Sequence, residues 1–129
     1  MSRDAVERAG LVGLLGGAGV MHVLQPRFFE RLVPAWVPGT PRFWNLASGA
    51  AEVTAAGLLL HPRTRRAGGA LAAATLAGVY PANVQAALDG GTPGLPGFAG
   101  SAAAAWLRLP LQAPPLWVAA RIARAAGTG

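Results

Sequence analysis

The sequence contains no cysteine and no lysine, so every basic side chain apart from histidine is an arginine. The lack of cysteine excludes a disulfide, a dithiol redox centre and any thiolate-bound metal or iron–sulfur cluster. Charge is also scarce, because 12% of the residues are charged and 53% are hydrophobic, whereas a soluble domain normally has roughly a quarter of its residues charged. This composition predicts a membrane protein rather than a soluble globule.

The net charge of +6 and the isoelectric point of about 11.8 are typical of proteins that bind nucleic acid. The arginines, however, lie mostly between apolar runs instead of gathering along one face or in one tail. We therefore do not expect nucleic acid as a partner.

Four apolar runs approach the length of about 20 residues that a helix needs to cross a bilayer. They lie near residues 9–25, 43–60, 67–88 and 106–122. A cleaved signal sequence is the weaker interpretation of the first run, because the same apolar character recurs three more times. We predict an all-α fold with one domain over residues 1–129, a bundle of four transmembrane helices. Residues 25–33 form either a short helix on the membrane surface or a packed loop.

The arginines also predict an orientation in the membrane. Seven of them fall on one side of the four runs and four on the other; these are Arg3, Arg8, Arg63, Arg65, Arg66, Arg121 and Arg124 against Arg27, Arg31, Arg42 and Arg108. The positive-inside rule places the richer side in the cytoplasm. We expect a multi-pass protein of the plasma membrane with both termini cytoplasmic and the lipid bilayer as a partner.

Polar side chains inside the apolar runs are the candidate site, because burying such groups in lipid is costly unless they are paired or hydrated. With the predicted orientation, all of them fall toward the outer leaflet. They are His22, Glu52, Asn83, Arg108 and Gln112. We expect Glu52 and Arg108 to form an ion pair, which serves either as a staple between helices, as part of a ligand site or in a proton relay.

We predict that these five residues line one pocket beneath the aromatic loop 26–44 and the Gly-rich loop 89–101. Such a pocket suits an amphipathic ligand with a polar head, for example a quinone, although a dry polar staple without a cavity remains the alternative. No metal site is predicted. His22 and His61 fall at opposite faces and cannot hold one haem together. Catalytic residues remain unknown.

A set of short motifs occurs in the order found in one family of small membrane proteins. These are Gly19-Val20-Met21-His22 with Pro26, Val33-Pro34-Ala35-Trp36-Val37-Pro38, Ser48-Gly49-Ala50-Ala51-Glu52, the basic turn 63–66, Tyr80-Pro81-Ala82-Asn83 and Leu107-Arg108-Leu109-Pro110-Leu111-Gln112. Through them the chain resembles the DoxX-like family. The resemblance implies a four-helix membrane bundle with a link to redox systems, and it supplies no agreed set of catalytic residues.

We therefore expect an accessory or quinone-linked subunit of a membrane redox system, with a redox enzyme as its partner. The alternative is a carrier or binding protein for a small or lipid-like molecule, which would use the polar pocket. A stand-alone oxidoreductase is a third interpretation, disfavoured by the lack of cysteine and of a paired histidine ligand. The spacing of Gly13 and Gly17 supports tight helix contacts within the bundle or between copies in a homo-oligomer.

Overall fold

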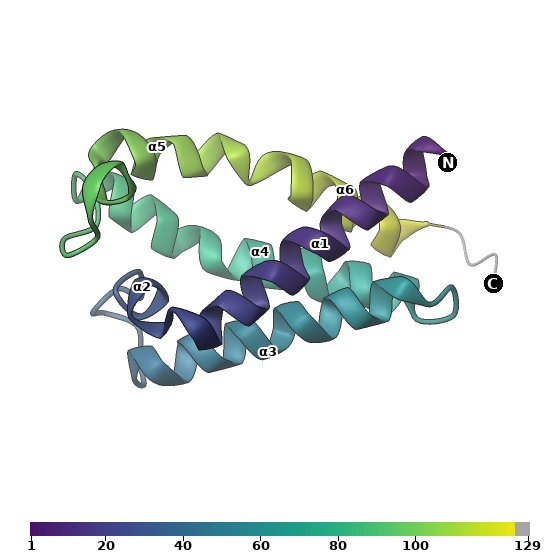
Figure 1. Cartoon of the computed structure of the whole chain (residues 1–129), viewed down its shortest axis with the longest axis horizontal. Helices are drawn as coiled ribbons and strands as arrows, with labels where there is room; N and C mark the ends of the chain where they lie inside the picture. The colour runs from purple at the N-terminus through teal and green to yellow at the C-terminus, as the bar shows by residue number, and fades with distance from the viewer. Residues whose placement is uncertain (126–129) are drawn as a thin grey trace.

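The computed structural model describes residues 1–125, which form six α-helices and one 3-10 turn. The elements are α1 (Arg3–Leu24), α2 (Pro26–Glu30), α3 (Pro41–Leu60), α4 (Arg65–Leu88), η1 (Gly97–Gly100), α5 (Ala102–Leu111) and α6 (Ala113–Arg124). Three long helices and the consecutive pair α5–α6 run alternately back and forth (Figure 1). The start of α1 and the end of α6 lie at one end of the bundle, and α2 and η1 lie at the other.

Hydroxyl side chains fix where three of the helices begin. The side-chain oxygens of Ser2, Thr40 and Ser101 each accept a hydrogen bond of 3.1 Å from the backbone N–H three residues further on. Such caps satisfy donors that the first helical turn leaves free. Pro41 follows one cap directly, where its missing N–H costs nothing. α1, α3 and α5 consequently start two to six residues before the apolar runs do.

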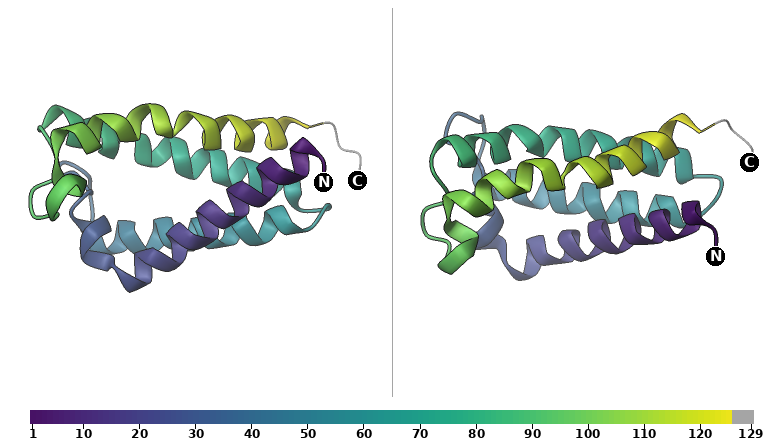
Figure 2. Two further views of the ribbon diagram at one scale, coloured as in Figure 1. Left: turned by 45° about the horizontal axis from the view of Figure 1, so that its top comes forward. Right: turned by 90° about the horizontal axis from the view of Figure 1, so that it is seen from above.

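The fourth apolar run is divided into two helices instead of one. α5 ends at Leu111, α6 begins at Ala113, and Gln112 lies between them. Pro114 and Pro115 have no N–H to donate to the carbonyls four residues earlier, so the helical hydrogen bonds are interrupted here. The two helices still follow one another along the same side of the bundle (Figure 2).

The core is small and is built largely of leucine and alanine. Its buried members come from α1, α3, α4 and α6; they are Leu11, Leu15, Ala55, Ala56, Leu59, Ala72, Leu76 and Ala119. Glycines let the backbones come close around it. A Cβ on Gly19 would lie 3.0 Å from the carbonyl oxygen of Gly49, and a Cβ on Gly69 would lie 2.8 Å from the backbone nitrogen of Ala123. Close helix approach therefore replaces bulky side chains as the means of filling the interior.

The predicted bundle of four transmembrane helices is wrong. Within residues 1–125, no helix is at once long enough and apolar enough to cross a bilayer. The runs owe much of their apolar character to alanine and glycine, which contribute little apolar surface each. α1 additionally contains Asp4 and Glu7, and α3 contains Asn45 and Glu52. Large apolar side chains are exposed nonetheless, among them Leu24, Leu60 and Trp117.

The expected multi-pass location in the plasma membrane, with cytoplasmic termini, is wrong for the same reason, because it depended on those four spans. A short helix does follow the first long one, as α2. Its expected position on a membrane surface rested on the same premise.

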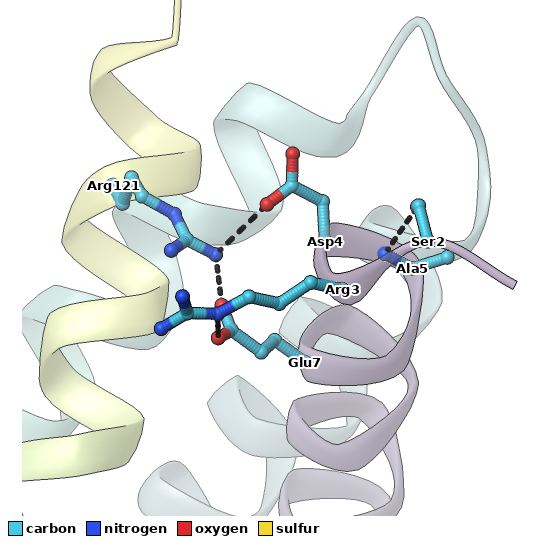
Figure 3. Close-up of polar contacts among 6 residues, drawn as sticks. All are labelled: Ser2, Arg3, Asp4, Ala5, Glu7 and Arg121. Atoms are coloured by element: carbon cyan, nitrogen blue, oxygen red, sulfur yellow. Dashed lines mark hydrogen bonds and ion pairs between the residues drawn. The ribbon is translucent and has the colours of Figure 1, made fainter.

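Charged side chains join the first and last helices where the start of α1 meets the end of α6 (Figure 3). Arg3 Nε donates to Glu7 Oε1 over 2.8 Å, and Arg121 contacts Glu7 and lies 3.4 Å from Asp4. The hydrogen bond from Arg3, followed by that from Arg121, lowers the pKa of Glu7 below its ordinary value. α1 and α6 thus meet at this end, and α1 diverges from α5 toward the other end (Figure 2).

Adding a methyl group at Gly19 or Gly49 should destabilise the protein by about 1–3 kcal/mol, because the close approach of α1 and α3 leaves no room for it. Gly57 is the matched control, since a Cβ there meets nothing within 4 Å and alanine favours a helix by up to about 1 kcal/mol. Denaturant unfolding of Gly19→Ala, Gly49→Ala and Gly57→Ala measures the difference. Equal stabilities for all three variants would contradict this account of the packing.

Replacing Arg121 by glutamine should lower the melting temperature at pH 7 by removing the cation between Asp4 and Glu7. A carboxyl with a lowered pKa stabilises the fold above its ordinary value of 4.5 and loses that contribution as the pH falls. The difference from the natural protein should therefore shrink in acid and in high salt. Arg124→Gln is the control, because Arg124 donates to its own helix at Ala120. A difference that persists at pH 3 would argue against an ionic cause.

Candidate functional site

A cavity of about 170 Å³ lies between α1, α2, α3 and α4, at the end of the bundle that holds α2. Apolar and aromatic side chains make up most of its wall, and a few polar groups face it. The lining residues are His22, Phe29, Leu32, Val33, Trp44, Asn45, Ser48, Glu52, Val79, Ala82 and Asn83. Apolar walls with a small number of placed polar groups are typical of small-molecule sites.

His22 is the centre of the polar side of this cavity. It is 6% exposed, and its ring is held from two directions. Nδ1 lies 2.6 Å from Asn45 Oδ1, and Nε2 lies 3.2 Å from Glu52 Oε2. The ring also stacks on Phe29, with centroids 3.7 Å apart and planes at 23°. The side chain of His22 is therefore fixed in position and in rotation.

The amide of Asn45 decides which ring nitrogen of His22 carries a proton. Asn45 Nδ2 donates to the backbone carbonyl of His22 over 3.0 Å, so the amide oxygen must be the atom that faces Nδ1. An amide oxygen can only accept, and Nδ1 must therefore be the donor. In a neutral imidazole the other nitrogen, Nε2, then presents its lone pair to Glu52. One proton between Nε2 and Oε2 removes the conflict between these two acceptors.

Glu52 is buried without full hydrogen bonding. Its side chain is 10% exposed, and Oε2 lies within ion-pair distance of His22 but at angles that do not make a hydrogen bond. Burial raises the pKa of Glu52 to about 7, because a low-dielectric surrounding disfavours the charged carboxylate. The carboxyl therefore retains its proton to near neutral pH.

Glycines and backbone carbonyls position the surrounding groups. A Cβ on Gly49 would lie 2.8 Å from Cβ of His22, so only glycine allows this histidine to lie against α3. The indole N–H of Trp44 donates to the carbonyl of Pro38 over 2.6 Å, which ties α3 to the preceding loop. The close packing at Gly49 and the bond to Pro38 thus fix the positions of His22 and Trp44 in the cavity wall.

Asn83 connects the cavity to the junction between α5 and α6. Asn83 Nδ2 donates to Gln112 Oε1 over 3.1 Å, and Gln112 Nε2 donates to the carbonyl of Leu76. Leu76 directly precedes Ala77, whose carbonyl lacks its helical donor because Pro81 has no N–H. Gln112 therefore ties the interrupted part of α4 to the junction of α5 and α6.

The two loops expected to cover the site do meet at this end of the molecule. The guanidinium of Arg31 lies 3.5 Å from the carbonyl of Pro93 in the second loop, and Trp36 Nε1 donates over 3.1 Å to Gln85 Oε1 near the end of α4. Leu32 and Val33, in the first loop, line the cavity directly. The first loop thus forms part of the wall, and the second loop contacts the first.

Three of the five predicted site residues, His22, Glu52 and Asn83, line the same cavity. Gln112 is buried one hydrogen bond behind Asn83. Arg108 does not line the cavity, and its guanidinium donates to the carbonyl of Ala99 over 2.7 Å. The expected ion pair between Glu52 and Arg108 is not formed within residues 1–125, and Glu52 faces His22 instead.

Sequence reasoning missed Asn45, Phe29 and Trp44 as parts of the site. Asn45 had a usable signal, because it lies seven residues, or two helical turns, before Glu52 in the same apolar run. Phe29 and Trp44 had none, since an aromatic residue beside a membrane-like run has an ordinary explanation at the bilayer surface. Their role depends on the fold of the loop between α2 and α3.

The arrangement can exchange hydrogen bonds and one proton with a bound molecule. His22 and Glu52 are the titratable groups that line it. Within residues 1–125, no group of three or more histidine, cysteine, aspartate or glutamate side chains could hold a metal ion. The polar groups on a largely apolar wall are suited to recognising a polar group on a largely apolar ligand.

Comparison with protein families matches residues 11–123 to a family described as a domain of unknown function (DUF8561). The resemblance to the DoxX-like family is wrong, because the match is to this other family. Each of the short motifs that carried the resemblance is weak by itself. No curated protein and no solved structure matches the chain.

The stability of the protein should fall as the pH rises from about 4.5 to 7. Glu52 keeps its proton up to a pKa of about 7 in the folded protein, whereas its ordinary value is 4.5. The folded state therefore binds more protons than the unfolded state in this interval, and each pH unit costs at most about 1.4 kcal/mol. Denaturant midpoints measured across this range should show the decline.

Glu52→Gln should remove this decline while preserving stability at pH 5, because the amide resembles the protonated carboxyl and can donate to His22 Nε2. Glu30→Gln, at the end of α2, is the matched control and should keep the decline. A decline of unchanged slope in Glu52→Gln would assign it to a different group.

Proposed function

We propose that this chain, which belongs to the DUF8561 family, binds a small organic molecule in the cavity between His22, Glu52 and Asn83. The observation that carries the proposal is the buried carboxyl of Glu52, which makes no hydrogen bond within residues 1–125, in a cavity whose walls are largely apolar and aromatic. A buried polar group without a partner destabilises a protein, and a ligand that supplies the partner offsets this cost.

The volume of the cavity is enough for about one ring. Its volume of about 170 Å³ is close to that of an engineered apolar cavity of roughly 150 Å³ that holds benzene in another protein. A six-membered ring with one small substituent fits such a volume. Phe29 and Trp44 offer aromatic surfaces to it, and aromatic pairs gain about 0.5–1.5 kcal/mol beyond the area they bury.

The rigidity of the site also supports binding. The ring of His22 is fixed by Asn45, Phe29 and the absence of a side chain on Gly49. A site whose groups are ordered beforehand loses less entropy when a ligand enters. The expectation that the chain is a subunit of a redox system stays a prediction, and the ligand-binding proposal does not depend on it.

A fluorine NMR titration with one-ring compounds tests the proposal. The probes are fluorobenzene, 4-fluorophenol, 4-fluoroanisole, 4-fluorobenzylamine and fluoro-1,4-benzoquinone, chosen for one ring size and different polar groups. At least one should bind with saturable line broadening. Ala82→Leu, which fills the cavity, should weaken that binding about tenfold or more.

Ala74→Leu is the matched control, because Ala74 is exposed on the same helix and does not line the cavity. It should bind the probe as the natural protein does. Saturable binding of no probe, or equal weakening by both leucine variants, would overturn the proposed function.

A further inference from the structure

We propose that the cavity selects an uncharged phenol, an aromatic ring with one hydroxyl group, whose O–H donates to the carboxyl of Glu52. The inference rests on the proposed function and names its ligand class. It follows from counting which hydrogen-bonding atoms around the cavity are already used and which are free.

His22, Asn45 and Glu52 form a polar cluster beside the cavity. Contacts within this polar cluster use most of its hydrogen-bonding atoms. Asn45 Nδ2 and Oδ1 bond to the backbone carbonyl and Nδ1 of His22, and His22 Nε2 faces Glu52 Oε2. The atom of this cluster left for a ligand is the second carboxyl oxygen, Oε1. With one proton between Nε2 and Oε2, Oε1 is a carbonyl oxygen if Glu52 is protonated and a carboxylate oxygen if His22 is protonated. It accepts a hydrogen bond in both forms, so the ligand must donate one.

The charge of the site requires an uncharged donor. Glu52 and His22 with one shared proton carry no net charge, whether the proton lies on oxygen or on nitrogen. The other polar residues lining the cavity, Ser48 and Asn83, are uncharged, as is the indole of Trp44. An ammonium group would bring a positive charge into a largely apolar cavity and would have to displace the shared proton. A hydroxyl group avoids both costs.

The ligand oxygen also needs a donor, and the cavity has two that can serve. Asn83 Nδ2 has two hydrogens and uses one for Gln112 Oε1. The hydroxyl of Ser48 is the second candidate. A hydroxyl oxygen both donates and accepts, and it therefore matches a carboxyl on one side and an amide or hydroxyl on the other. An ether or a quinone carbonyl only accepts and leaves Glu52 without its partner.

The rank order of the same fluorinated probes tests this inference. 4-Fluorophenol should bind about tenfold or more tightly than fluorobenzene, which is smaller, and 4-fluoroanisole, which has the oxygen without the hydrogen. It should also bind more tightly than 4-fluorobenzylamine and fluoro-1,4-benzoquinone. Tighter binding of the amine or the quinone would overturn the inference while leaving the proposed function in place.

Variants at Glu52 separate the hydrogen bond from the shape of the cavity. Glu52→Leu should lose the preference for 4-fluorophenol yet still bind fluorobenzene, which reports that the cavity is intact. The conservative variant Glu52→Gln keeps an acceptor oxygen and should restore most of the preference. Glu30→Leu, a carboxyl outside the cavity lining, is the matched control and should bind 4-fluorophenol normally. A preference that survives in Glu52→Leu would contradict the assignment of Glu52.

Discussion

The contact between α1 and α3 at Gly19 and Gly49 determines both the packing and the site. Gly19 lies against the backbone of Gly49 and the side chain of Val53, and Gly49 lies against His22. Without side chains at these positions the two helices come close enough for Asn45 to bond both the ring and the backbone carbonyl of His22. The same helix face continues to the buried Ala55, Ala56 and Leu59, so the core and the polar cluster share one interface.

The bundle has two ends with different electrostatic roles. At the end where α1 begins and α6 ends, Arg121 joins α6 to Asp4 and Glu7 in contact with water, where ionic contacts contribute modestly and are weakened by salt. At the other end, His22 and Glu52 are buried, and desolvation raises the pKa of Glu52. The charges that join α1 to α6 are therefore in contact with water, whereas the pair beside the cavity can stay neutral by sharing a proton.

The helical segments and part of the site could be predicted from the sequence, but the environment of the helices could not. His22, Glu52 and Asn83 were identified because a polar group inside an apolar run is costly in lipid and in a protein interior alike. That argument does not say which apolar medium surrounds the run, and the runs of alanine and glycine proved too weakly apolar to span a bilayer. The prediction that Arg108 belongs to the site was wrong, because its guanidinium donates to the backbone carbonyl of Ala99 in a turn. Every residue has a backbone carbonyl, so the sequence does not indicate which one an arginine will bond. The division of the fourth run into two helices at Gln112 could be predicted from Pro114 and Pro115. These residues have no N–H to continue the hydrogen bonds of α5.

The polar cluster is not explained by stability alone. An apolar side chain at residue 52 would avoid the desolvation of a carboxyl, and replacing buried polar pairs by apolar residues is often neutral or stabilising. Asn45 and His22 satisfy each other, whereas Glu52 Oε2 lies 3.2 Å from His22 Nε2 without forming a hydrogen bond. Its burial also makes stability depend on pH near neutrality. Places where a sequence departs from the most stable choice are where function is expected. Glu52 is such a departure at the wall of a cavity sized for one ring, and a ligand hydroxyl would complete its hydrogen bonding.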